Sequence, residues 1–390
     1  MISAGEEGSV YANSTLTISD NTLLNDLVSP SSLAVMNATG SSAAIEDNAF
    51  YGLTPAQIVS GPAVVAGNTL LAAEPALPSL APSVPGALAT VEVGGGSAPQ
   101  TLTNSGNLVV GGATALTITD LAGGNTILGG AGGLTVTGFT GDQIVTAAGA
   151  ADTITLAGRN ATLDSLGADT IAATAGSNII FAAGDAIITT AAGTSNTLTL
   201  SGNALVSSGG SDLIQLGAGN DTINATGAVT VLGGAGNVTI NGGAGDVTFI
   251  AGTGTASLQG GAGALDVTAG SGNLTLTGGT GNDSFTAGTG NAVLNPGGGT
   301  NTITLGSGET TVNLGFGSTT FYLPSSHPGG TDILNNWQII GDILEPEGYG
   351  NGLPVAKAWA VLTPSGETQL NLVLKDNTHL GLAQALVQHF

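Results

Sequence analysis

The chain of 390 residues contains no cysteine, so neither disulfide bonds nor cysteine-ligated metal sites can stabilise it. It has three basic residues, Arg159, Lys357 and Lys375, against 26 acidic ones, and a formal net charge of −23. Nucleic acids and anionic membranes bind proteins through a basic footprint. The scarcity of positive charge therefore predicts that neither is a partner, and an acidic surface suits a soluble extracellular protein.

Long apolar runs are absent as well. No run reaches the ~18 residues of a membrane-spanning helix, and the most apolar region, residues 61–93, is interrupted by five prolines. The first 30 residues contain Glu6 and Glu7 and have neither a basic segment nor an unbroken apolar core. We therefore expect no membrane span and no Sec signal peptide.

Residue types that carry catalysis are also scarce. The three histidines, His327, His379 and His389, do not form the His-Glu-x-x-His motif of zinc proteases. Polysaccharide lyases and hydrolases combine clustered carboxylates with basic groups that stabilise developing charge, yet Arg159 is the one basic residue among the repeats described below. The sequence predicts no enzyme and no catalytic or cofactor-binding residue. A polysaccharide-acting enzyme is retained as an alternative.

Glycine, by contrast, is abundant and periodic. A glycine recurs at every ninth position from Gly227 to Gly317, and a large apolar residue stands four positions after each one. These apolar residues are Val231, Ile240, Phe249, Leu258, Val267, Leu276, Phe285, Leu294, Ile303, Val312 and Phe321. A fixed period of nine residues indicates a repeat architecture.

Nine residues suit one short strand and one tight turn, for which the glycines are expected to supply positive φ angles. The apolar residue of each strand should point inward and its neighbours, such as Thr275 and Thr277 around Leu276, outward. One such strand buries little surface, so the units must coil and stack. The pattern predicts an all-β chain that forms a parallel β-solenoid, similar to a β-roll, with two nonapeptide strands per coil.

One stretch resembles a known family. Residues 278–286, Gly-Gly-Thr-Gly-Asn-Asp-Ser-Phe-Thr, resemble the nonapeptide of RTX (repeat-in-toxin) proteins, and residues 216–223 match all but its first glycine. The resemblance implies a bacterial protein exported by type I secretion, with Ca²⁺ bound between coils by the aspartate and turn carbonyls. Among the eleven regular units, however, only one keeps that aspartate, as Asp283. Most coils are therefore expected to lack metal.

Further aspartates recur two residues before an apolar position outside the regular run. With Asp283 they form the set of candidate calcium ligands: Asp152, Asp169, Asp185, Asp212, Asp221 and Asp283. Asp142 has the same spacing. Asp152, Asp169 and Asp185 are about one coil apart, so we expect them to stack along one edge, where carboxylates repel unless a cation lies between them. The alternative is a set of solvent-exposed turn aspartates. No cofactor is required, and a few calcium ions are the one ligand considered.

Threonine pairs form another row. Thr117 and Thr119, Thr135 and Thr137, and Thr153 and Thr155 flank inward residues 18 positions apart, hence on one face of consecutive coils. Such a face orders ice-like water in some solenoids, so ice binding is a further alternative. The row ends at Ala172, which favours β-propensity as its cause.

The chain divides into three predicted regions. Residues 1–90 form an N-terminal cap and assembly region with a proline-rich linker, 91–321 the solenoid, and 322–390 a C-terminal cap. By the RTX resemblance this last region would also carry a secretion signal. Local patterns predict a helical turn at residues 23–28, a helix starting at Thr54, a β-hairpin over residues 359–374 and a terminal helix at residues 380–387.

Together these features predict a secreted bacterial structural or adhesive protein of a cell surface or extracellular matrix, of S-layer, adhesin or self-assembling filament type. Its expected partners are other copies, joined end to end into a filament or lattice, or a surface polysaccharide. The expected location is extracellular or at the cell surface. A calcium-binding RTX module is the principal alternative.

Overall fold

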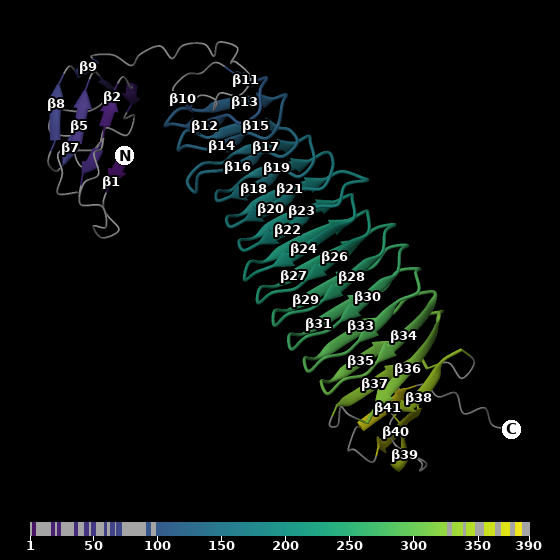
Figure 1. Cartoon of the computed structure of the whole chain (residues 1–390). Coiled ribbons are helices and arrows are strands. Elements are labelled where there is room, and N and C mark those ends of the chain that lie inside the picture. Colours follow the sequence, from purple (N-terminus) through teal and green to yellow (C-terminus); the bar gives the residue numbers. More distant parts are fainter. Residues whose placement is uncertain are drawn as a thin grey trace.

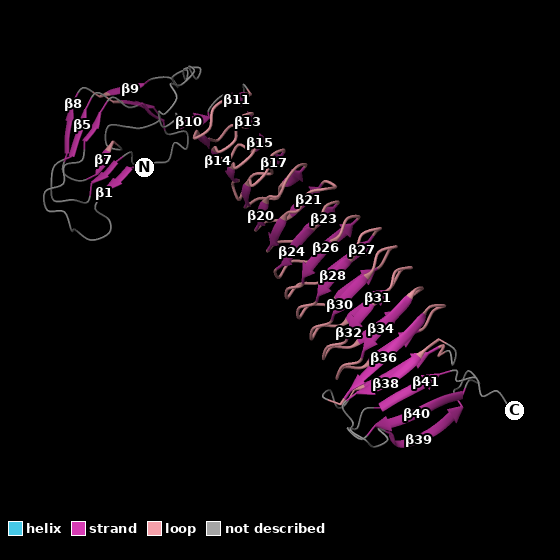
Figure 2. Cartoon of the chain, turned by 45° about the vertical axis from the view of Figure 1, so that its right-hand side comes forward, coloured by secondary structure: helices cyan, strands magenta, loops and turns pink. Residues whose placement is uncertain are grey.

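The computed structural model describes residues 99–325 without a break, residues 330–337 and 341–347, and the strands before and after these ranges with a few neighbouring residues. The described residues contain strands and turns but no helix (Figure 2). Two long sheets of parallel strands make up the solenoid (Figure 1). The predicted all-β, parallel β-solenoid is therefore confirmed.

One sheet contains 15 strands and takes the even-numbered strands of the solenoid. They are β10 (Val91–Gly94), β12 (Leu108–Gly111), β14 (Thr126–Leu128), β16 (Gln143–Val145), β18 (Thr162–Ser165), β20 (Ile179–Ala182), β22 (Thr197–Leu200), β24 (Asp212–Leu216), β26 (Val229–Leu232), β28 (Val247–Ile250), β30 (Leu265–Thr268), β32 (Ser284–Thr286), β34 (Thr300–Thr304), β36 (Ser318–Pro324) and β38 (Ile343–Glu347).

The other sheet contains 17 strands and takes the odd-numbered strands of the solenoid and β40. They are β11 (Gln100–Leu102), β13 (Leu116–Asp120), β15 (Leu134–Gly138), β17 (Thr153–Leu156), β19 (Thr170–Ala173), β21 (Ala186–Thr190), β23 (Ala204–Ser208), β25 (Asp221–Ala225), β27 (Val238–Gly242), β29 (Ala256–Gln259), β31 (Leu274–Thr277), β33 (Ala292–Asn295), β35 (Thr310–Asn313), β37 (Thr331–Asn335), β39 (Val355–Leu362), β40 (Thr368–Leu374) and β41 (His379–Ala383).

The register confirms two strands per coil. Val231 pairs with Ile214 before it and Phe249 after it, and Ile240 pairs with Ile223 and Leu258. The nonapeptides therefore alternate between the two sheets, and each inward residue stacks on its equivalent about 18 positions away. The apolar residues of both sheets meet in one continuous core, in which Val231 and Phe249 are 0% and 1% exposed.

The periodic glycines have a different role from the one predicted. Of the eleven, only Gly299 has a positive φ. The others are required because the turns of successive coils lie almost in contact. A Cβ on Gly236 would overlap the carbonyl oxygen of Gly219, and one on Gly272 would overlap that of Gly254. Substitution is therefore opposed by the neighbouring backbone rather than by the conformation of the glycine itself.

Both sheets continue beyond Phe321. Strands β37 and β38 extend them, and the β-hairpin predicted over residues 359–374 is present as the antiparallel pair β39 and β40. The predicted terminal helix is wrong where the structure describes it, because residues 379–383 form strand β41. This strand pairs with β37 and β40 and buries Leu380, so tertiary pairing overrides local helix propensity.

Residues 1–71 show no sequence period, yet their described strands also stack in parallel. Three sheets of three strands, β1-β4-β7, β2-β5-β8 and β3-β6-β9, give three strands per turn instead of two. The strands are β1 (Ile2–Ala4), β2 (Thr17–Ser19), β3 (Thr22–Leu24), β4 (Val35–Asn37), β5 (Ala43–Glu46), β6 (Ala49–Tyr51), β7 (Val59–Ser60), β8 (Ala63–Ala66) and β9 (Thr69–Leu71).

Two local predictions in this region are wrong where they can be compared. Residues 22–24 form strand β3 instead of entering the predicted helical turn, whose remainder lies outside the described residues. The helix expected from Thr54 does not include Val59, which begins strand β7. Residues 72–90, with the predicted linker, also lie outside the described residues.

Candidate functional site

The candidate site residues lie at the two corners where the chain enters a strand. The first corner row lies just before, or at the first residue of, strands in the 15-stranded sheet. Its members occupy one register position and their side chains point inward. They are Asn107, Asn125, Asp142, Asn178, Asn196 and Asp212. The second corner row is at the equivalent position of the 17-stranded sheet and contains Asp152, Asp169 and Asp221. All nine side chains are buried.

In eight of these nine residues the Oδ1 atom accepts a hydrogen bond from a backbone N–H one coil earlier. Asn125 Oδ1 accepts from the Asn107 N–H at 2.7 Å, Asn196 Oδ1 from the Asn178 N–H at 3.0 Å, and Asp212 Oδ1 from the Asn196 N–H at 2.8 Å. A corner N–H is costly to bury unpaired, and these side-chain oxygens supply its acceptor where a backbone carbonyl does not. The rows therefore tie successive coils together.

Five of the six candidate calcium ligands are buried. Asp152, Asp169, Asp212 and Asp221 belong to the corner rows, and Asp283 occupies the first-row position of a later coil, where its Oδ1 accepts from the Leu265 N–H at 2.9 Å. The alternative of solvent-exposed turn aspartates is thus wrong for these five. It holds for Asp185, which is exposed.

The expected stack of three carboxylates forms only in part. The Asp152 N–H donates to Asp169 Oδ1 at 2.9 Å, so these two residues lie one above the other. Thr170 then pairs with Ile187, which places Ala186 rather than Asp185 at the next position. The coil from Asp169 to Ala186 has 17 residues, so Asp185 stands one residue before the row and is exposed at the outer edge.

Two of the buried aspartates are held by hydroxyl groups. Asp169 Oδ2 accepts hydrogen bonds from Thr146 Oγ1 and Ser165 Oγ, both at 2.7 Å. Asp212 Oδ2 accepts from Thr190 Oγ1 and from Ser208 Oγ in the same arrangement. The two threonines were not predicted, because each precedes its aspartate by more than a full coil, whereas each serine stands four residues before its aspartate and could have been found from that repeated spacing.

A buried pair of carboxyl groups lies near the start of the solenoid. Asp142 accepts from the N–H groups of Asn125 and Phe139, while Asp120 accepts from the N–H of Gly123 and from the Asn125 side chain. Burial, with a smaller contribution from the negative charge of Asp120, raises the pKa of Asp142 to about 6. Asp120 was missed because it ends a strand instead of starting one.

Other corner carboxyls are perturbed in the same direction. Burial raises the pKa of Asp221 to about 6 and that of Asp332, at the second-row position of β37, to about 7. Burial also raises the pKa values of Asp152 and Asp283. Removal from water disfavours the charged form of a carboxyl group, and no basic side chain is among the causes of the raised pKa at these four.

These groups fit calcium poorly. Ca²⁺ takes six to eight oxygen ligands, whereas each of the five buried candidates already accepts from a backbone N–H or a hydroxyl, and Asp152 Oδ2 and Asp283 Oδ2 are the oxygens left without a donor. Within the part of the chain that the structure describes, no three His, Cys, Asp or Glu residues lie together as a metal site would need. The rows can therefore act as hydrogen-bond acceptors, and the resemblance to the RTX motif at residues 278–286 does not by itself create a metal site.

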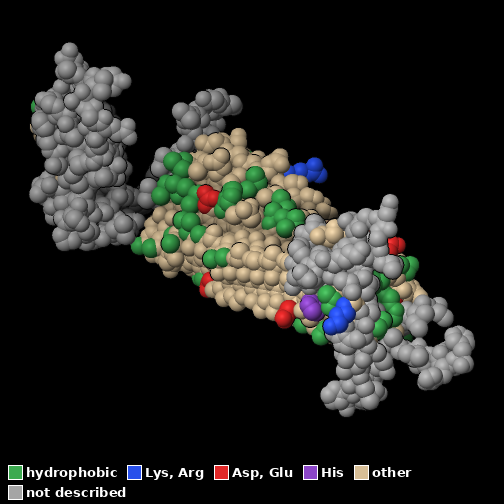
Figure 3. Space-filling view, turned by 90° about the horizontal axis from the view of Figure 1, so that it is seen from below, with side chains coloured by type: hydrophobic (Ala, Val, Ile, Leu, Met, Phe, Trp, Pro, Cys, Tyr) green, Lys and Arg blue, Asp and Glu red, His purple; other side chains and the backbone are tan. Residues whose placement is uncertain are grey.

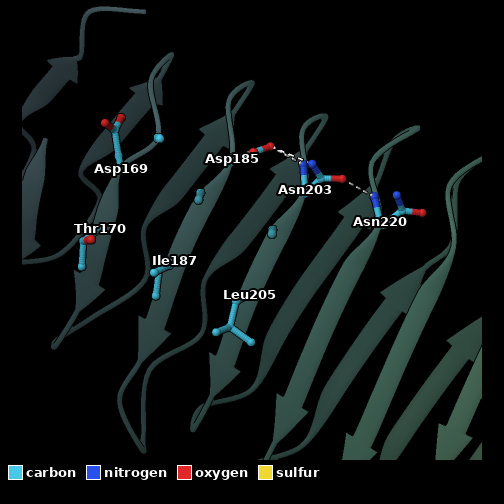
Figure 4. A pocket seen from close by; sticks show the side chains of 10 residues that line it. Asp169, Thr170, Asp185, Ile187, Asn203, Leu205 and Asn220 are labelled. Carbon is cyan, nitrogen blue, oxygen red and sulfur yellow. Dashed lines mark hydrogen bonds between the residues drawn. The ribbon is translucent and has the colours of Figure 1, made fainter. Parts of the chain in front are cut away.

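A shallow surface depression of about 440 Å³ lies over strands β19, β21 and β23. Its polar edge is a row of side chains, in which Asp185 Oδ1 accepts from the Asn203 N–H at 3.1 Å and Asn203 Oδ1 accepts from the Asn220 N–H at 2.8 Å (Figure 4). Its floor includes Ile187 and Leu205, which are 52% and 43% exposed. The depression therefore offers amide and carboxylate groups beside aliphatic surface.

The asparagines of the first corner row could have been found from the sequence. Asn125, Asn178 and Asn196 each stand two residues before a buried apolar residue, the same spacing that singled out the aspartates. Extending that search from aspartate to asparagine would have shown one nearly continuous polar row.

Comparison with known proteins identifies no relative. No protein-family model matches the chain, and neither a curated protein nor a solved structure is significantly similar to it. The RTX resemblance therefore stays a prediction that depends on residues 216–223 and 278–286. No helix among the described residues is long and apolar enough to cross a membrane.

Proposed function

We propose that this protein is a secreted bacterial structural or adhesive protein of a cell surface or extracellular matrix, in which the solenoid is a stiff rod and catalyses no reaction. Type I secretion, suggested by the RTX resemblance, is part of this proposal. The partners are further copies of the chain or a surface polysaccharide.

The observation that carries the proposal is the absence of inserted loops along the solenoid. From β12 to β36 the longest connection between strands has seven residues, between Val145 and Thr153. Catalytic and binding residues of enzymes are disproportionately carried on loops supported by a rigid scaffold. A body whose coils are joined only by tight turns presents flat faces and edges instead, which suits a spacer or a contact surface.

Stiffness follows from how the coils are joined. Adjacent coils share strand hydrogen bonds in both sheets, the corner rows, and turns whose glycines leave no room for a side chain. At about 4.8 Å per strand, the 15-stranded sheet is roughly 65 Å long. A bend would have to break several of these contacts at once.

The depression beside Asp185 supports the polysaccharide contact. Amide and carboxylate groups can bond sugar hydroxyls, while Ile187 and Leu205 can pack against the apolar faces of sugar rings. The experiment is co-sedimentation of the full-length protein with a panel of insoluble bacterial and plant polysaccharides, with reducing ends assayed in parallel. We expect binding to at least one polymer without release of reducing ends.

A matched pair of variants tests where the polymer binds. Ile187→Asp should weaken binding, whereas Val293→Asp, 42% exposed on the same sheet but far along the solenoid, should not. Release of reducing ends would support an enzyme instead. Failure to bind any polymer would leave other copies of the chain as the partner.

Two alternatives have an observation in their favour. For a calcium module it is Asp283, whose Oδ2 has no hydrogen-bond partner among the described residues. For ice binding it is the register of Thr117, Thr135 and Thr153, which lie in one row on the outer face of β13, β15 and β17. That row covers only three coils before Thr170 is followed by Ala172, so we favour the structural role.

A further inference from the structure

On seven of the nine strands from β12 to β28, large apolar side chains project from the outward face of the 15-stranded sheet, with threonine and glutamine between them, and we call this region the apolar face. Its most prominent side chains are Val145, Ile179, Phe181, Leu213, Leu232 and Ile250. Of these, Ile179, Phe181 and Ile250 are 44%, 44% and 47% exposed. Figure 3 shows hydrophobic side chains gathered over the half of the solenoid that starts at β10.

Beyond β28, the outward face of the same sheet is polar over strands β30, β32 and β34. The outward residues of β30, β32 and β34 are Asp266 with Thr268, Ser284 with Thr286, and Thr302 with Thr304. β-propensity does not explain this difference, because threonine and isoleucine both favour strands. An exposed cluster of large apolar residues on one half of a regular rod therefore indicates a contact surface.

Despite the net charge of −23, the apolar face is almost neutral. Asp164 on β18 is its one charged outward residue. Many other acidic residues of the solenoid, such as Asp142, Asp169 and Asp221, are buried at the corners and do not project from the faces. Charge repulsion between two copies is therefore weak at this surface.

We propose that two copies of this chain associate side by side through the apolar face. This inference rests on the proposed structural function and specifies the contact between copies. A second copy carries rows of side chains at the same spacing of about 4.8 Å, so its residues can interdigitate with those of the first over many coils. The face measures roughly 38 Å by 13 Å, which buries about 1,000 Å² in total, the lower end of specific interfaces.

Contact through the ends fits the described residues less well. Strand β38 contains Pro346, which has no N–H to donate to an added strand. At the same end the 17-stranded sheet turns into the antiparallel strands β39 and β40. Head-to-tail stacking of the parallel sheets would be interrupted at both, whereas the apolar face needs no free strand edge.

Sedimentation velocity of the full-length protein over a range of concentrations tests the proposal, combined with small-angle X-ray scattering. We expect a monomer–dimer equilibrium in which the dimer is thicker than the monomer instead of twice as long. Phe181→Asp and, independently, Leu213→Asp should weaken the dimer at least about tenfold, because each would bury an unpaired charge. Leu205→Asp is the matched control, since Leu205 is 43% exposed on the opposite sheet.

Three outcomes would overturn the proposal: a wild-type monomer at every concentration, a dimer of doubled length, or equal weakening by Phe181→Asp and Leu205→Asp. Circular dichroism of each variant confirms that a lost dimer is not lost folding. A monomeric particle that is still elongated in scattering contradicts only the dimer, whereas a compact particle contradicts the proposed rod itself.

Discussion

The two halves of the solenoid, before and after Ala225, differ in which groups accept hydrogen bonds from the N–H groups at the strand corners. In coils before Ala225, the corner N–H groups are paired largely with side-chain oxygens, as in the bond from Asn196 to Asp212. In the regular nonapeptide run, Val229 and Val247 occupy the equivalent corner, and their N–H groups donate to the backbone carbonyls of Asp246 and Ala264, each at 2.9 Å. Both halves nevertheless have two parallel strands per coil.

This difference shows what the strict period achieves. A regular turn with closely packed glycines brings a backbone carbonyl to the corner, so the side chain there can be apolar and join the core. In coils before Ala225 an asparagine or aspartate supplies the acceptor more often, although Asp283 and Asn301 do so in the regular run as well. Buried carboxyl groups with raised pKa values therefore occur in both halves, at Asp142, Asp152 and Asp221 in the first and at Asp283 and Asp332 in the second.

The largest effect is expected from charging the core of the regular half. Leu276→Asp places a carboxylate at a position that is 2% exposed and should lower the free energy of unfolding by about 4 kcal/mol or more. Thr275→Asp, on the exposed outer face, is the control and should change it little. Urea denaturation measures both. Equal losses would mean that the inward and outward assignments are wrong.

The second prediction compares one corner aspartate in each half. Asp212→Val leaves the Asn196 N–H and the hydroxyls of Thr190 and Ser208 without their acceptor, for an expected loss of about 3 kcal/mol. Asp283→Val removes an acceptor from the Leu265 N–H alone and should cost about 1 kcal/mol. If denaturation shows equal losses, the corner rows do not distinguish the halves.

A third prediction concerns pH. Folding raises the pKa of Asp142 and Asp221 to about 6 and that of Asp332 to about 7, from an ordinary value of 3.8. Between these values the folded state binds more protons than the unfolded state, so stability decreases as pH rises. The stability from these groups is complete below pH 3.8 and lost above about pH 7.

Thermal unfolding across this pH range should therefore give a melting temperature that falls as pH rises. Asp221→Asn keeps an acceptor for the Ala204 N–H but cannot titrate, so its melting temperature should fall less steeply than that of the wild type. A melting temperature that rises with pH would show that these carboxyls are not destabilised by burial.

The smallest effect is expected from calcium. Because ten of the eleven regular units lack the aspartate of the RTX motif, circular dichroism and the melting temperature should be nearly the same in EDTA and in excess Ca²⁺. A chain that is disordered in EDTA and gains strand signal only with calcium would contradict the structural role and support the calcium module. Asp283→Asn then tests whether that residue is a ligand.

The sequence by itself determined the parts of the fold that depend on local alternation. The period of nine, with Val231, Ile240 and Phe249 at fixed positions, predicted the coil, its two strands and its inner face. These features follow from the geometry of a strand, where side chains alternate, and from the need of each short unit to stack.

Only the tertiary structure decided what surrounds each corner and end. Asp169 meets Thr146 from the preceding coil, 23 residues away along the chain, and Asp185 misses the same row by one residue. Residues 379–383 are a strand because β37 and β40 offer partners on both sides. In each case the deciding contact comes from a neighbouring coil, at a distance along the chain that local propensity and spacing do not encode.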